Sequence, residues 1–102
     1  MPKFKPGVVF WNMHPKIIWA LEEIDKIHKE MAASELCTVT AARDSDHMKG
    51  SLHYEGRAVD IRTRTIYGGD KQYFKDKVKA ALGEGFDVVL ESDHLHVEWD
   101  PK

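Results

Sequence analysis

The segment "SLHYEGRAVDIRT" places a histidine and an aspartate, His53 and Asp60, seven positions apart. Asp60 stands between two β-branched residues, so it is a carboxylate in the middle of an expected strand. A buried carboxylate is costly unless it is paired or bound to a ligand. Two small neighbours, Gly56 and Ala58, allow close approach to the backbone. We therefore expect Asp60 to belong either to a site that holds a ligand or to a simple ion pair.

A second group of chemically capable residues lies near the C-terminus, in "ESDHLHVEW". His94 and His96 share one face of an expected strand, about 7 Å apart by the strand rise. Two imidazoles and one carboxylate form the ligand set of a catalytic zinc site, and His53, Asp60 and His96 supply that set. The side chains left over nearby for proton transfer are Asp93, Glu91 and His94. Taken singly, each histidine could equally be a satisfied core residue.

Two helices are expected to support these residues. Apolar side chains recur at steps of three and four from Pro15 to Met31, which predicts an amphipathic helix with Pro15 in its first turn and Asn12 as a possible cap. A second helix is predicted from Asp70 to Leu82, ended by Gly83. The apolar faces of the two helices hold Ile17, Ile18, Leu21, Ile24, Ile27 or His28, and Met31 in the first, and Phe74, Val78, Ala81 and Leu82 in the second.

Four strands are expected, over residues 36–42, 57–63, 86–90 and 94–99, with a turn-rich loop over 43–51. In the second strand Arg62 and Arg64 share parity with Asp60, so they either lie beside the metal or end the strand in solvent. The pattern predicts a small single domain of the α+β class over residues 1–102, with two helices packed on a mainly antiparallel sheet.

Composition limits the function classes. The 102 residues are 42% hydrophobic and 31% charged, with a net charge of −2, so we expect no nucleic-acid partner. Cys37 is the only cysteine, which excludes an internal disulfide and predicts a core residue. No run approaches the roughly 20 apolar residues of a membrane span, and none has the length of a signal-peptide core. We expect cytoplasmic synthesis without a signal peptide and without membrane insertion.

The residues also carry a family resemblance. "SLHYEGRAVD" matches the S-x-H-x-x-G-x-A-x-D motif of zinc peptidases that cut peptidoglycan stem peptides, among them D-alanyl-D-alanine carboxypeptidases and phage L-alanyl-D-glutamate endopeptidases. It is even more similar to the hedgehog signalling domain, which shares that fold. "DHLH" resembles the elements that end these catalytic domains, so the resemblance covers roughly residues 39–99, and the motif-bearing part is about 36–100.

The resemblance implies roles for single residues. It makes His53, Asp60 and His96 the ligands of Zn²⁺. Asp93, three residues before the last ligand, is implied as the catalytic base, with Glu91 as the hedgehog-like alternative. His94 is implied to contact the tetrahedral intermediate or to support a ligand, and Arg43 to offset the developing negative charge unless it is a plain surface residue.

The function that we expect from this resemblance is a zinc metallopeptidase acting on peptidoglycan peptides. A phage lysis enzyme, which reaches the wall after membrane permeabilisation, is one form that this function takes. It needs no obligate protein partner. The alternative is a hedgehog-like, zinc-containing binding module without peptidase activity. A hydrolase depends on the proton shuttle at Asp93 or Glu91, whereas a binding module tolerates its loss.

Overall fold

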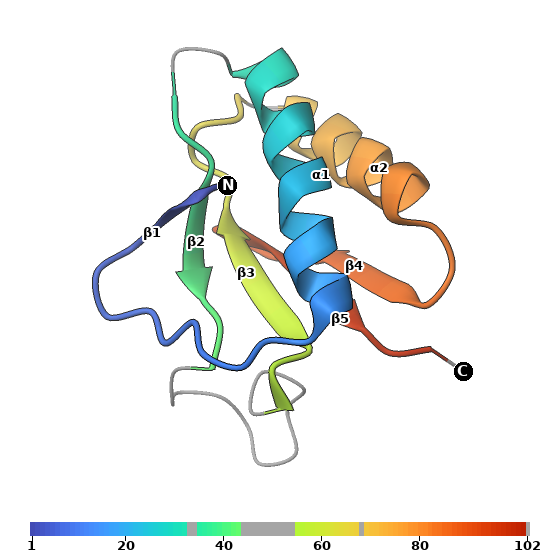
Figure 1. The fold of residues 1–102 in the computed structure, drawn as a ribbon. Helices are drawn as coiled ribbons and strands as arrows, with labels where there is room; N and C mark the ends of the chain where they lie inside the picture. Colours follow the sequence, from blue (N-terminus) through green and yellow to red (C-terminus); the bar gives the residue numbers. More distant parts are fainter. Residues whose placement is uncertain (33–34, 44–54, 68, 102) are drawn as a thin grey trace.

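The computed structural model describes residues 1–32, 35–43, 55–67 and 69–101. The elements follow one another as β1 (Lys3–Phe4), α1 (Pro15–Met31), β2 (Thr38–Ala41), β3 (Ala58–Arg62), α2 (Asp70–Leu82), β4 (Phe86–Leu90) and β5 (His94–Trp99). The strands form one sheet in the order β1-β2-β3-β5-β4, and both helices cover the same face of it (Figure 1). Within the described residues, neither helix is long and apolar enough to cross a membrane. The predicted α+β class is confirmed.

The sheet is antiparallel except at one edge, where β1 runs parallel to β2. β1 is not among the four strands expected from the sequence. It adds to the sheet through hydrogen bonds from the Lys3 and Lys5 amides to the carbonyls of Cys37 and Val39. Two paired residues are too few to show alternation in a sequence, so pattern alone could not predict this strand.

Helix α1 starts where predicted, but its cap differs. The backbone N–H of Lys16 donates to Nδ1 of His14, 3.0 Å away, which makes His14 the N-cap, with Pro15 in the first turn. Asn12 has a positive φ of 49° and lies before the cap. The buried side chains of α1 are Ile17, Ala20, Leu21, Ile24, Ile27 and His28. Ile18, expected on this face, is exposed.

Helix α2 has the predicted bounds and ends at Gly83, whose φ of 77° favours glycine. Its buried residues are Phe74, Val78 and Leu82, whereas Ala81 faces solvent. Cys37 lies in the core, as predicted, and burial raises the pKa of its thiol to about 12. The core therefore fills the space between the helices and one face of the sheet. We call the opposite face, which neither helix covers, the open face (Figure 1).

Candidate metal centre

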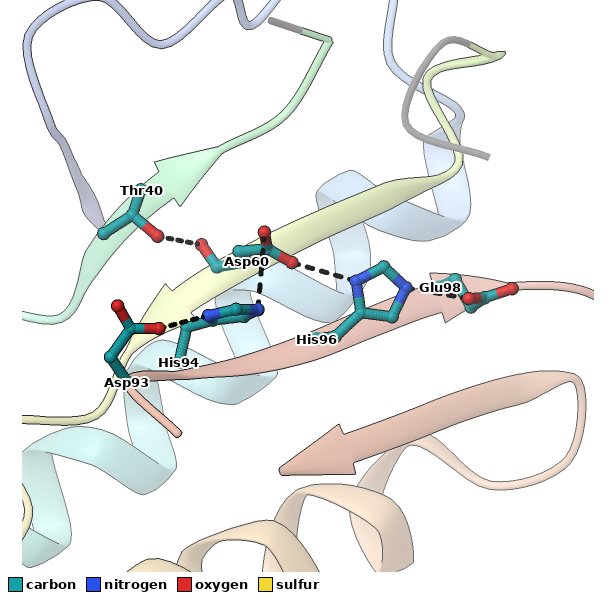
Figure 2. Close-up of polar contacts among 6 residues, drawn as sticks. All are labelled: Thr40, Asp60, Asp93, His94, His96 and Glu98. Atoms are coloured by element: carbon teal, nitrogen blue, oxygen red, sulfur yellow. Dashed lines mark hydrogen bonds and ion pairs between the residues drawn. The ribbon is translucent and has the colours of Figure 1, made fainter. Parts of the chain in front are cut away.

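The centre lies on the open face of the sheet, where β3 and β5 are paired. Alternation along β3 sends Val59 and Ile61 into the core and leaves Asp60 on the open face. The register pairs Asp60 with His96, and Oδ1 of the carboxylate lies 2.9 Å from Nδ1 of the imidazole (Figure 2). Asp60 is only 7% exposed, and the hydroxyl of Thr40 donates to its backbone oxygen at 3.4 Å. The carboxylate is therefore held in one place beside a histidine.

His96 contacts carboxylates on both sides. Its Nε2 lies 2.7 Å from Oε1 of Glu98, two residues along the same strand. The hydrogen bond with Asp60 raises the pKa of His96 to about 8, burial opposes this shift, and Glu98 adds to it. In the imidazolium form both ring N–H groups donate to carboxylates. The side chains thus form an acid–histidine–acid chain at neutral pH.

His94 joins the same cluster from the next position on this face. Its Nε2 lies 3.7 Å from Oδ2 of Asp60, and its Nδ1 lies 2.6 Å from Oδ1 of Asp93 (Figure 2). The hydrogen bond and the charge of His94 lower the pKa of Asp93, whose side chain is 85% exposed. The carboxylate of Asp60 therefore lies close to two imidazoles of β5, those of His94 and His96.

The geometry fits a metal ion bound by Asp60 and His96. Two ligand atoms that each lie about 2 Å from the same zinc ion are on the order of 3 Å from each other. Oδ1 of Asp60 and Nδ1 of His96 have this separation. Histidine ligands of metals usually give their other ring nitrogen to a carboxylate, which is the position of Glu98. The third predicted ligand, His53, lies outside the described residues. Asp60 and His96 thus fit the predicted zinc site.

The described residues also contain a group of three carboxylates that the sequence reasoning did not single out: Asp87, Glu98 and Asp100. Asp87 of β4 is paired with Glu98 of β5 in register. Because both positions alternate with core valines, an acidic pair on the open face could have been predicted from the strand pattern. Glu98 belongs to both clusters, since it also contacts His96.

The residues predicted to be catalytic do not all gather at the centre. Asp93 and His94 line a pocket of about 380 Å³ that also borders Asp60. Arg43 is not among the residues that line this pocket. Its Nη2 donates to the backbone oxygen of Asn12 at 3.3 Å, and its guanidinium lies so close to Gly56 that a Cβ on that residue would come 3.0 Å from Nη2. The backbone N–H of Glu91 donates to the carbonyl of His94, which closes the turn between β4 and β5.

A small α+β domain with a histidine–carboxylate centre on the open face of its sheet can belong to more than one family, and comparison with known proteins decides between them. The model of the hedgehog amino-terminal signalling domain matches residues 21–99. The chain belongs to this family.

Individual hedgehog proteins agree with the family match. The chain is 39% identical to the Tiggy-winkle hedgehog protein of Danio rerio over 59 residues, which is 58% of this chain and 14% of that protein. It is 39% identical to the Indian hedgehog B protein of Danio rerio over 66 residues, or 63% of this chain and 15% of that protein. For the Indian hedgehog protein of Xenopus laevis the identity is 37% over 59 residues, 58% of this chain and 14% of that protein. The chain therefore matches about a seventh of the length of these relatives.

Family membership corrects the predicted function. The predicted peptidoglycan metallopeptidase, with its wall substrate and its role in phage lysis, is wrong, because the chain belongs to a family of signalling domains and its relatives are hedgehog proteins. The physical reason is that the shared motif specifies only which metal-binding side chains are present. Such a ligand set does not determine whether the protein catalyses a reaction. The alternative, a hedgehog-like binding module, agrees with the match.

Two further expectations, on partners and on location, are also wrong. The absence of a protein partner is contradicted, because a signalling domain acts through other proteins. The expected cytoplasmic location, with access to the wall after membrane permeabilisation, is contradicted by the same membership. Domains of this family can bind zinc in general, and among the described residues the group of three ligand atoms close enough to share one ion is the carboxylate cluster of Asp87, Glu98 and Asp100.

Proposed function

We propose that this chain is a protein-binding module of the hedgehog type, in which a structural zinc ion shapes the recognition surface. The unit is a single domain over residues 1–102, with the motif-bearing part at about 36–100. His53, Asp60 and His96 hold the ion, and His94 supports the centre. The observation that carries this proposal is the Asp60–His96–Glu98 chain, which joins two strands on the open face of the sheet.

The donor types favour zinc at this centre over a harder cation. Imidazole nitrogens suit zinc, whereas Ca²⁺ and Mg²⁺ prefer oxygen ligands such as those of the Asp87, Glu98 and Asp100 group. Zinc would replace the proton on Nδ1 of His96, whereas Nε2 would keep its proton and its hydrogen bond to Glu98. Its positive charge then compensates the buried carboxylate of Asp60, so metal binding stabilises the folded state.

The sheet around the centre offers a surface for a partner. The open face is not covered by either helix (Figure 1), and a pocket of about 380 Å³ borders Asp60 and His94 on it. A zinc ion held by Asp60 of β3 and His96 of β5 would link the two strands beside this pocket. We therefore assign the ion a structural role in binding.

The metal is tested by elemental analysis and thermal unfolding of wild type, Asp60→Asn and His96→Gln after dialysis against micromolar zinc. We expect one zinc per wild-type chain and a rise in Tm of roughly 10–20 °C at a hundredfold excess over Kd, with both effects lost in the two variants.

The matched control is Asp87→Asn, which removes one carboxylate from the oxygen-rich group and leaves Asp60 and His96 intact. It should keep its zinc. Loss of the metal in Asp87→Asn together with its retention in Asp60→Asn would refute the assignment of the site. Protein partners can then be compared for zinc-loaded and chelated protein by calorimetry, where equal affinity would remove the structural role of the ion.

A further inference from the structure

A second and larger hollow lies on the open face, beside the candidate metal centre. This pocket has a volume of about 630 Å³, and Lys3, Leu36, Arg62, Arg64 and Tyr67 are among its lining residues. Arg62 and Arg64 also line the pocket of about 380 Å³ that borders Asp60. The two arginines therefore form the wall between the hollows. We call the larger hollow the arginine pocket.

The cationic side chains at this wall make no ion pair with the described residues. Across the part of the chain that the structure describes, no ion pair or hydrogen bond involves the side chains of Lys3, Arg62 or Arg64. The same is true of Lys5, which lines the smaller pocket. The acids of the smaller pocket, Asp60 and Asp93, are hydrogen-bonded to histidines, and one carboxylate, that of Glu35, lies at the arginine pocket. An anionic ligand is therefore favoured.

Apolar groups lie beside these cations. Tyr67 is 83% exposed and Leu36 is 64% exposed, and both line the arginine pocket. An arginine fork recognises a carboxylate with two parallel hydrogen bonds, and an exposed leucine and tyrosine offer contact area to an apolar side chain. The pocket thus combines recognition of acid with recognition of apolar surface.

We propose that the arginine pocket binds an acidic peptide segment of a protein partner, in which carboxylates lie next to a large apolar side chain. This inference rests on the proposed binding function, since it names the chemistry of the partner. A long sulfated polysaccharide matches the surface less well. The two pockets together hold four cationic side chains, and the carboxylates of Asp87, Glu98 and Asp100, which repel a polyanion, lie on β4, β5 and just after it. Such a polymer also has no apolar group to place against Leu36 and Tyr67.

The test measures fluorescence anisotropy of the full chain with a labelled peptide that alternates glutamate and leucine. The comparison peptide has glutamine in place of each glutamate. We expect the acidic peptide alone to bind, with an affinity that falls as salt is raised. The double variant Arg62→Gln/Arg64→Gln should bind it at least roughly tenfold more weakly, and Tyr67→Ser several-fold more weakly.

The matched control is Lys29→Gln/Lys79→Gln, which removes the same charge from exposed helix positions and should bind like wild type. Equal weakening in this control, or equal binding of the glutamine peptide, would overturn the inference. A heparin fragment that binds more tightly than the peptide and depends on the same arginines would overturn the choice of a peptide.

Zinc content of each sample separates this inference from the function on which it rests. A zinc-loaded protein that ignores the acidic peptide refutes the arginine pocket and leaves the metal centre standing. A protein that takes up no zinc on dialysis against micromolar zinc, yet binds the peptide through Arg62 and Arg64, supports the pocket and contradicts the metal centre.

Discussion

Asp60 and His96 face each other across β3 and β5, with the carboxylate Oδ1 2.9 Å from the imidazole Nδ1. The two residues are 36 positions apart in the chain, and antiparallel pairing of their strands brings them together. The contact is a hydrogen-bonded ion pair, and under the proposed function the same two atoms would be ligands of the metal. The behaviour of the centre therefore depends on whether His96 carries a proton or a metal ion.

The metal-free protein should lose stability as the pH rises through the pKa of His96. This pKa is about 8 in the folded protein and 6.5 in the unfolded chain, so the folded state binds the proton more tightly. The contribution is fully present below pH 6.5 and is lost as the pH rises through about 8; it amounts to roughly 2 kcal/mol. Urea unfolding of chelated protein between pH 6 and 9 measures it. His96→Gln should flatten this part of the profile, and an unchanged slope in that variant would contradict the prediction.

Zinc affinity should show the opposite dependence on pH. Below about pH 8 the metal competes with the proton on His96, so the apparent Kd rises about tenfold for each pH unit that the solution is acidified. Competition with a chromophoric chelator, corrected for the chelator's own protonation, gives this slope. A Kd that does not change between pH 6 and 8 would show that His96 is not a ligand.

Glu98→Gln should weaken zinc binding without removing a ligand. Glu98 accepts the N–H on Nε2 of His96 and fixes the ring with Nδ1 toward Asp60. Loss of such a support typically costs about 10–100-fold in metal affinity. Isothermal titration with zinc measures the change, with exposed Glu84→Gln as a control for the lost charge. Equal effects of the two variants would reduce the role of Glu98 to long-range electrostatics.

Gly56→Ala should destabilise the fold more than Gly7→Ala does. Both glycines have positive φ, 73° and 92°, so each substitution carries backbone strain of about 1–2 kcal/mol. A Cβ at Gly56 would also come 2.8 Å from the backbone oxygen of Asn12, whereas a Cβ at Gly7 meets nothing within 4 Å. Chemical unfolding of the two variants side by side measures the difference, and equal costs would mean that the Asn12 segment moves freely away.

Arg43→Gln should lower stability and leave zinc affinity unchanged. The guanidinium donates to the carbonyl of Asn12, and the Arg43 backbone N–H donates to the carbonyl of Val9, so the residue attaches the N-terminal arm to the end of β2. A lost charged hydrogen bond costs about 2 kcal/mol. Unfolding and zinc titration on one sample separate the two effects. A change in zinc Kd at constant stability would place Arg43 in the metal centre after all.

Much of the architecture is predictable from local pattern. Apolar side chains that recur at steps of three and four residues predicted both helices, and Gly83 predicted the observed end of α2. Periodicity did not reveal the His14 cap, because a histidine ring nitrogen seldom takes that role. It also failed for β1, whose pairing depends on β2, a strand more than 30 residues further along the chain. Strand alternation put Asp60, His94 and His96 on one face, and their mutual distances needed the register.

The function, like the fold, was predicted from the sequence only in part. The motif around His53 and Asp60 led to two families that share a ligand set, and the choice of a peptidase was wrong, because the donors of a metal site do not specify what the surrounding surface does. The sequence by itself determined the fold class, the helices and the types of donor, since these follow from local periodicity and residue chemistry. The tertiary structure decided which groups touch: Asp60 with His96, Arg43 with Asn12, and Arg62 and Arg64 as the wall between two pockets. These contacts depend on strand register and on packing between distant segments, and neither is encoded in a pattern that spans only a few residues.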